Sequence, residues 1–193
     1  MRATTAAGDH RGWSKLDWAI DAALELASVA LARSDRVGAA AFSQELDVWV
    51  PPGKGSRQKL RLTRRLFDLH ATTGEGDLAR ALQELATRHR RRATVLVLSD
   101  VADPLSVETQ KRALAMASRR HRIVFAALDD PGLRALTGDA SAPVEERAAA
   151  LELVQDRRRA LRSLSSSGAR VLDALPAEAA GPLLAAWLEE RSA

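Results

Sequence analysis

Three short, almost uninterrupted apolar runs constrain the fold of this chain more than any other feature. They are TVLVLS at 94–99, IVFAAL at 123–128 and ARVL at 169–172. Runs of this length without alternating polar residues are typical of strands that are buried on both faces. The segments between them are long enough for helical crossovers. The sequence therefore predicts an α/β fold with a mainly parallel sheet covered by helices.

A helix and a hairpin are predicted ahead of these strands. Between Leu16 and Ala32 the apolar residues recur at intervals of three and four, as on one face of an amphipathic helix, and Ser14 is a suitable N-cap. The apolar runs 37–42 and 47–50, separated by a polar turn, predict a hairpin at the edge of the sheet. Pro51, Pro52 and the glycines that follow are expected to end this unit.

Capping residues mark the expected starts of later helices. Ser56 precedes a helix with a leucine stripe on its buried side. Asp103 and Asp130, each followed by a proline, are the expected N-caps of two further helices. A long helix is predicted over about 143–164, before the last strand.

The length and composition bound the possible classes of protein. With 193 residues the chain suits one domain, which we place at 15–193 after a small, polar and flexible lead-in at 1–14. The absence of Cys excludes disulfides, thiolate catalysis and Cys-based zinc sites. No apolar run approaches the roughly 20 residues of a membrane-spanning helix, and no secretory signal is evident. We therefore expect a cytoplasmic protein.

Charged residues are predicted to gather at opposite edges of the sheet. Acidic residues follow the strands, at Asp100, Asp103, Asp129, Asp130 and Asp173, and ligands bind at this carboxyl edge in doubly wound sheets. Basic residues precede two strands, at 88–92 and 119–122. Helix capping and the helix dipole explain such a separation without any ligand. A binding role for either edge remains the alternative interpretation.

Three segments carry a resemblance to a known family. They are KLDWAIDAALELASVALARSDRVGAAAF at 15–42, VLVLSD ending at Asp100, and the tail from 143 to 188, which contains GARVLDALP. Together they resemble the C-terminal half of the bacterial family called domain of unknown function 58 (DUF58), a von Willebrand factor A-like domain. The resemblance implies a Rossmann-like, three-layer domain with a metal-ion-dependent adhesion site at its carboxyl edge. It also implies a role beside MoxR-type AAA+ ATPases in assembling or remodelling other proteins.

The sequence departs from the family pattern at the metal site. No Asp-x-Ser-x-Ser motif occurs, and no strand precedes the first helix. We therefore expect a chain truncated at its N-terminus, with the first central strand missing and the adhesion site degenerate or incomplete. Asp100 matches the family's later Asp, and Asp77 is a second remnant of the ligand set. Two carboxylates rarely hold Mg²⁺ alone, so we expect no cofactor, with Mg²⁺ possible only in an N-terminally complete form.

The resemblance and the acidic edge together predict a protein-binding domain that is not an enzyme. The expected partner is an acidic protein or a MoxR-type AAA+ ATPase that docks on the carboxyl edge around Asp77, Asp100 and Asp103. Tryptophan is enriched in binding hot spots, so Trp13, Trp18 and Trp49 are further candidates for the interface. Trp187 falls on the apolar stripe of the last helix and is assigned to the core, and the arginine run at 157–162 to a solvated face.

Two alternatives to protein binding were weighed. An electrostatic nucleic-acid binder would use the basic edge, through Arg90, Arg91, Arg92, Arg119 and Arg120. No aromatic residues are interleaved with these arginines, so we regard nucleic acid as the less favoured partner. A metal-dependent phosphoryl-transfer enzyme ranks last, because neither a phosphate-binding loop nor a nucleophilic Asp is evident.

Overall fold

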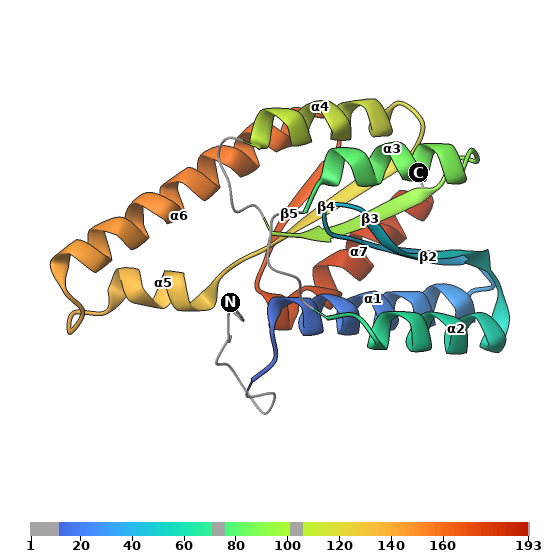
Figure 1. Cartoon of the computed structure of the whole chain (residues 1–193), viewed down its shortest axis with the longest axis horizontal. Helices are drawn as coiled ribbons and strands as arrows, with labels where there is room; N and C mark the ends of the chain where they lie inside the picture. The colour runs from blue at the N-terminus through green and yellow to red at the C-terminus, as the bar shows by residue number, and fades with distance from the viewer. Residues whose placement is uncertain (1–11, 71–75, 101–105, 193) are drawn as a thin grey trace.

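The computed structural model describes residues 12–70, 76–100 and 106–192. Helices and strands are interspersed along the chain (Figure 1). In order, the described elements are α1 Lys15–Ala32, β1 Val37–Phe42, β2 Leu46–Gly53, α2 Gly55–Phe67, α3 Leu78–Arg88, β3 Thr94–Ser99, α4 Val107–Ser118, β4 Arg122–Leu128, α5 Pro131–Gly138, α6 Val144–Ser165, β5 Arg170–Ala174, the 3-10 turn η1 Pro176–Glu178 and α7 Ala180–Ser192. The predicted α/β class is confirmed.

The strands form two separate sheets. β3, β4 and β5 are parallel and lie in that order, with Val97 opposite Phe125 and Phe125 opposite Val171. This arrangement is compatible with a Rossmann-like fold. β1 and β2 form an antiparallel hairpin of their own. The expectation that the hairpin extends the parallel sheet is wrong for the described residues, since no strand pairing joins the two sheets.

Burial differs sharply between the two clearest strands. Every residue of β4 from Ile123 to Leu128 is buried, because β4 lies between β3 and β5 and is covered on both faces. Most residues of β3 are only half-buried, and Val97 alone is fully buried. The apolar run at 94–99 predicts a strand buried on both faces, but β3 lies at the border of the parallel sheet. One of its edges therefore pairs with no described strand.

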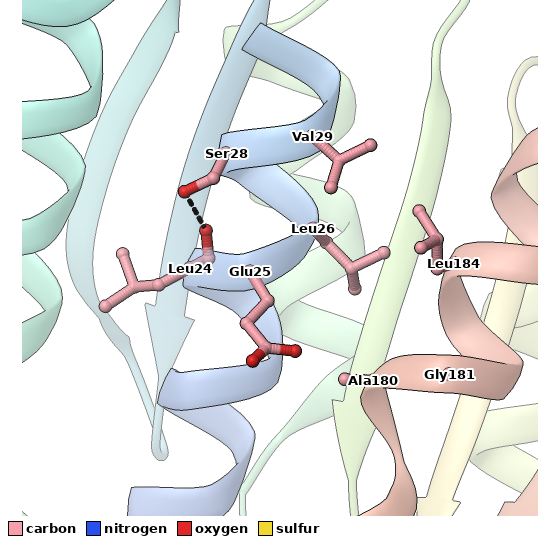
Figure 2. Close-up of a pocket in the computed structure, with 8 residues that line it drawn as sticks. All are labelled: Leu24, Glu25, Leu26, Ser28, Val29, Ala180, Gly181 and Leu184. Carbon is pink, nitrogen blue, oxygen red and sulfur yellow. Dashed lines mark hydrogen bonds between the residues drawn. The ribbon is translucent and has the colours of Figure 1, made fainter. Parts of the chain in front are cut away.

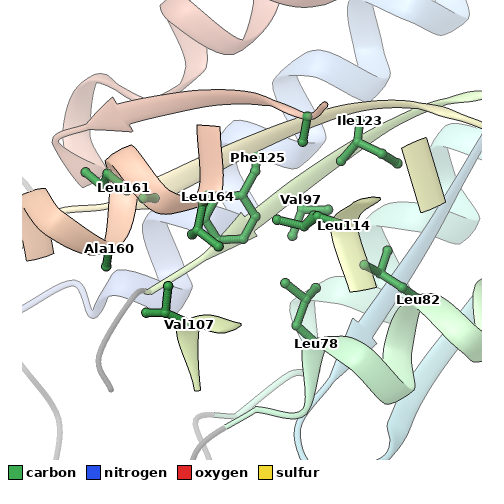
Figure 3. Close-up of a cluster of buried hydrophobic side chains, with 12 residues drawn as sticks. Leu78, Leu82, Val97, Val107, Leu114, Ile123, Phe125, Ala160, Leu161 and Leu164 are labelled. Atoms are coloured by element: carbon green, nitrogen blue, oxygen red, sulfur yellow. The ribbon is translucent and has the colours of Figure 1, made fainter. Parts of the chain in front are cut away.

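Helices cover the parallel sheet on both faces. On one face, α3, α4 and α6 pack over β3 and β4 around Phe125, Leu114 and Leu164 (Figure 3). On the other face, Ala22 and Leu26 of α1 pack with α7 and the opposite side of the strands. Farther along, α1 also packs against the hairpin and α2, in a third apolar cluster. Helix α1 therefore joins the hairpin to the parallel sheet.

The helix caps largely follow the expected residues. Ser14 accepts from the Asp17 N–H, and Asp17 accepts from the Ser14 N–H, so α1 begins with a capping box. Asp130 caps α5 as predicted. Ser56 is not a cap: α2 begins one residue earlier, and no side chain caps it. Asp103 lies outside the described residues.

The prolines do not end the hairpin where we expected. β2 continues through Pro51 and Pro52 to Gly53. Because β2 pairs only with β1 among the described strands, its outer edge needs no backbone donor, and proline is tolerated there.

Candidate functional site at the carboxyl end of the sheet

The carboxyl ends of the three parallel strands carry the expected acidic residues. Asp100 directly follows β3, Asp129 directly follows β4, and Asp173 is the next-to-last residue of β5. The N-termini of α1 and α5 lie at the same edge, since Lys15 of α1 contacts both Asp100 and the α5 cap Asp130. Three strand ends and two helix starts therefore supply one cluster of ionic side chains, which we call the carboxyl-edge network.

Arg157 of α6 lies at the centre of this network. Its side chain is only 9% exposed. Nε lies 3.2 Å from Asp129 Oδ1, and Nη2 donates to Asp173 Oδ1 at 2.8 Å and to the Ala127 carbonyl at 3.0 Å. Nη1 lies 3.7 Å from Asp100 Oδ1. One guanidinium thus contacts groups at the ends of all three parallel strands.

Asp129 is the buried anion of the carboxyl-edge network. Its side chain is 4% exposed and pairs with both Arg157 and Arg134. Its Oδ1 also accepts the Asp130 N–H at 2.9 Å. A buried carboxylate is tolerated only when it is paired and hydrogen-bonded. Oδ1 has a hydrogen bond, and the charge on Oδ2 is balanced by its ion pair with Arg134.

Lys15 neutralises the opposite side of the carboxyl-edge network. Its Nζ lies 2.7 Å from Asp100 Oδ2 and 3.4 Å from Asp130 Oδ2. Burial alone would raise the pKa of Asp130. The backbone N–H groups of Leu133 and Gly132, together with the Lys15 ammonium, outweigh burial and hold that pKa below its ordinary value. Asp130 therefore remains ionised near neutral pH.

These residues do not fit a divalent cation. The Lys15 ammonium already lies on the Asp100 carboxylate at hydrogen-bond distance, and Arg157 lies on its other oxygen. Mg²⁺ and Ca²⁺ need several free oxygen ligands. Among the described residues, no group of three or more metal-ligating side chains comes together. Two cationic side chains thus already neutralise the Asp100 carboxylate.

The predicted acid Asp77 lies outside the carboxyl-edge network. Asp77 is the N-cap of α3: its Oδ1 accepts the Arg80 N–H at 2.9 Å, while its own N–H donates to the Ser43 carbonyl. That capping role accounts for an acidic residue at this position without a ligand. Asp103, a predicted partner contact, lies outside the described residues.

The tryptophans fall into two environments. Trp13 and Trp18 contact one another, with ring centroids 4.7 Å apart, and Trp18 is buried in the core. Trp49 is half-buried on β2, with the Arg88 guanidinium 5.9 Å from its ring centroid. Trp13 and Trp49 therefore keep some exposed surface. Trp187 is buried, which confirms its assignment to the core.

The basic edge lies at the amino ends of β3 and β4. Its five predicted arginines are all exposed and form no ion pair with any described residue: Arg90, Arg91, Arg92, Arg119 and Arg120. Beside them, His121 is buried and stacks on His89 at 6.3 Å between ring centroids. Burial lowers the pKa of His121, and the neighbouring His89 and Arg120 lower it further.

Sequence reasoning missed the two cations of the carboxyl-edge network. Arg157 was assigned to a solvated face, which is wrong. The signal was present in the spacing: Ala150, Leu161 and Leu164 lie seven residues before, four after and seven after Arg157, and all three are buried. Residues at these intervals share one helix face. Lys15 gave no such signal, because its partners are distant in sequence.

A shallow apolar hollow lies between α1 and α7, away from this network. Figure 2 shows Leu26 and Val29 of α1 facing Leu184 of α7, with Glu25 nearby. The hollow begins nine residues along α1 from Lys15, or about 14 Å at the rise of an α-helix. Few polar groups line it, so it offers no chemistry of its own.

Comparison with known proteins places the chain in a family. No curated protein matches it at a significant level. None of the helices in the described ranges is both long and apolar enough to cross a bilayer. The family model described as "Protein of unknown function DUF58" matches residues 3–171. That match covers most of the chain, including every member of the carboxyl-edge network except Asp173, and the chain belongs to the DUF58 family.

Proposed function

We propose that this chain is a non-enzymatic protein-binding domain of the von Willebrand factor A-like type, and that its partner docks on the carboxyl-edge network. One observation carries the proposal: the exposed carboxylates Asp100 and Asp173 are held in fixed positions by the buried Arg157. Pre-organised charges lower the entropic cost of binding and select a complementary surface.

The chemistry of the network favours recognition over catalysis. A general acid or base works best with a pKa near the working pH. The pKa of Asp130 is lowered, which moves it further from neutral pH and makes this carboxyl a poorer proton donor. Arg157, with its permanent charge, forms ion pairs with three carboxylates and cannot serve as a proton donor or acceptor near neutral pH. The network is therefore suited to presenting charge.

The resemblance to DUF58 relatives supports an adaptor role beside a MoxR-type AAA+ ATPase. Asp100, Asp130 and Asp173 outnumber the exposed cation Arg134 at the rim of the network. A partner surface with Lys or Arg residues complements this rim. In this proposal the adhesion site works without a metal ion, because Lys15 and Arg157 replace it.

The test is a binding titration between the chain and a purified MoxR-type ATPase. We expect Asp100→Ala and Asp173→Asn each to weaken binding. As salt rises, binding of the wild type should fall more steeply than binding of either variant, because more of its charge pairs are screened. Glu146→Gln, an exposed acid on α6 with no described ion pair, is the matched control and is expected to leave binding unchanged. Equal binding by all variants, or none by the wild type, would refute the proposal.

The basic edge supports nucleic acid as a second candidate partner. Five exposed arginines without described acidic partners form an electrostatic footprint of the kind that phosphates neutralise. The triple variant Arg90→Gln/Arg91→Gln/Arg92→Gln would then lose salt-dependent retention of an oligonucleotide. Retention of the oligonucleotide equal to that of the wild type would exclude this edge as the binding surface.

A further inference from the structure

The positive charge of the chain is concentrated on one short helix. Residues 54–67, which span α2 and its N-cap, hold six cations and no acid: Lys54, Arg57, Lys59, Arg61, Arg64 and Arg65. The formal net charge of the whole chain is +4, so the remaining residues together carry a net charge of −2. Helix α2 alone makes this a basic protein.

The six cations face solvent without partners in the part of the chain that the structure describes. All six are exposed, and none forms an ion pair or a side-chain hydrogen bond with a described residue. Elsewhere, cations such as Arg80, Arg112 and Arg191 pair with acids. The unpaired charges on α2 generate a strong local positive potential.

Apolar side chains alternate with these cations on the outer face. Arg57, Leu60, Arg64 and Phe67 follow one another at intervals of three, four and three, so they form one stripe along about 15 Å of helix. Leu60 is 51% exposed and Phe67 is 77% exposed. Large apolar side chains that alternate with exposed arginines on a solvent-facing helix indicate an interaction surface.

The opposite face of α2 is fixed to the protein, so this stripe cannot turn inward. Leu62 and Leu66 are buried, and Leu62 belongs to the cluster with α1 and the hairpin. The buried Gln58 amide donates to the Val37 carbonyl at 2.8 Å and to the Pro51 carbonyl at 2.9 Å. Helix α2 lies beside α1 at the lower border of the molecule in Figure 1.

We infer that α2 is a membrane-surface site, which lies flat on an anionic lipid bilayer with Leu60 and Phe67 inserted among the headgroups. A helix with a basic face and exposed apolar side chains binds the interface in this way, since arginines reach the phosphates while their stems stay near the acyl chains. The charge and the apolar stripe therefore act on the same partner. This surface is separate from the carboxyl-edge network and does not depend on its proposed function.

An anionic bilayer fits these observations better than nucleic acid or an acidic protein. Phosphates of a duplex would use the cations but leave Leu60 and Phe67 exposed to water. A single strand could stack a base on Phe67 but would still leave Leu60 without an apolar partner. An acidic peptide would need its own apolar groups in matching positions. Only a lipid interface offers continuous negative charge above a continuous apolar layer.

The test is co-sedimentation of the full chain with vesicles that contain phosphatidylglycerol, compared with pure phosphatidylcholine vesicles. We expect binding to the anionic vesicles that weakens as salt rises. Arg57→Gln/Arg64→Gln is expected to weaken partitioning about 30-fold, because each cation near an anionic surface contributes about fivefold. Leu60→Ser/Phe67→Ser is expected to weaken it by about tenfold or more.

Two matched controls isolate the stripe. Arg158→Gln/Arg162→Gln removes the same charge from exposed positions on α6, and Met116→Ser removes an exposed apolar side chain from α4. Both are expected to bind as the wild type does. All substituted side chains are exposed, so the thermal midpoints should stay close together, and the salt dependence of the wild type gives a readout that needs no variant.

Several results would overturn the inference. These are absence of wild-type binding to anionic vesicles, equal binding to neutral vesicles, or equal losses in the α6 control. Retention of an oligonucleotide that depends on Arg57 and Arg64, without vesicle binding, would instead assign the surface to nucleic acid.

Discussion

Replacing Arg157 with methionine tests whether one guanidinium holds the carboxyl edge together. Methionine keeps most of the volume and the unbranched stem but leaves Asp129 buried without its main partner. Breaking a buried ion pair by removing one member costs about 3–5 kcal/mol. Asp129 retains Arg134, whose side chain is 56% exposed, so we expect the lower end, about 3 kcal/mol.

Urea unfolding, followed by far-UV circular dichroism, measures this cost. With a slope of about 2 kcal/mol/M, the midpoint of Arg157→Met should fall by about 1.5 M without a change in slope. Arg158→Met is the matched control: it lies one residue along α6, is exposed, and has no described ion pair. A surface change of this kind should stay within about 0.5 kcal/mol.

A double-mutant cycle with Asp129→Asn then separates burial of the charge from loss of packing. Because the neutral amide costs less to bury unpaired, the double variant should lose less stability than the two single variants combined, by about 1–3 kcal/mol. Additive losses of stability would contradict this role of Arg157. So would an Arg157→Met variant as stable as Arg158→Met.

Three further results are expected. The folded-state pKa of His121 is lowered from its ordinary 6.5, so the unfolded chain takes up a proton first as pH falls. Stability should therefore decline below about pH 6.5 and level off below the folded pKa. Urea titrations at several pH values should show a flatter decline for His121→Phe. Ser14→Ala removes a capping box and should cost about 1 kcal/mol in thermal unfolding, whereas Ser14→Asp should keep most of it. Because Lys15 and Arg157 occupy the Asp100 carboxylate, Mg²⁺ should leave the thermal midpoint unchanged, and a clear rise would contradict our assignment of the site.

Local patterns predicted the elements well, because helix and strand periods depend on neighbouring residues. The strand at 94–99 and the capped start of α1 were recovered in this way. The half-burial of β3 was not, because it depends on which strand lies at the border of the sheet. That order is set by tertiary pairing, which apolar periodicity does not encode.

The sequence predicted the acidic residues of the site but not the cationic ones. The acids Asp100, Asp129 and Asp173 follow from strand ends, since parallel strands end at one edge. Their neutralisation by Lys15 and Arg157 required contacts across 85 residues in one case, and the arginine was hidden within a charged run. The basic stripe on α2 was readable from composition, but its exposure was not, because the same periodicity also describes a helix with a partner.

Helix α1 is shared by two parts of the molecule, the parallel sheet and the hairpin with α2. It spans 18 residues, about 27 Å, and packs on the parallel sheet near one end and on the hairpin and α2 near the other. Lys15 marks its first turn, and Asp35, just past its last, pairs with Arg191 of α7. Because both units bury apolar surface against this one helix, loss of α1 would uncover the cores of both at once.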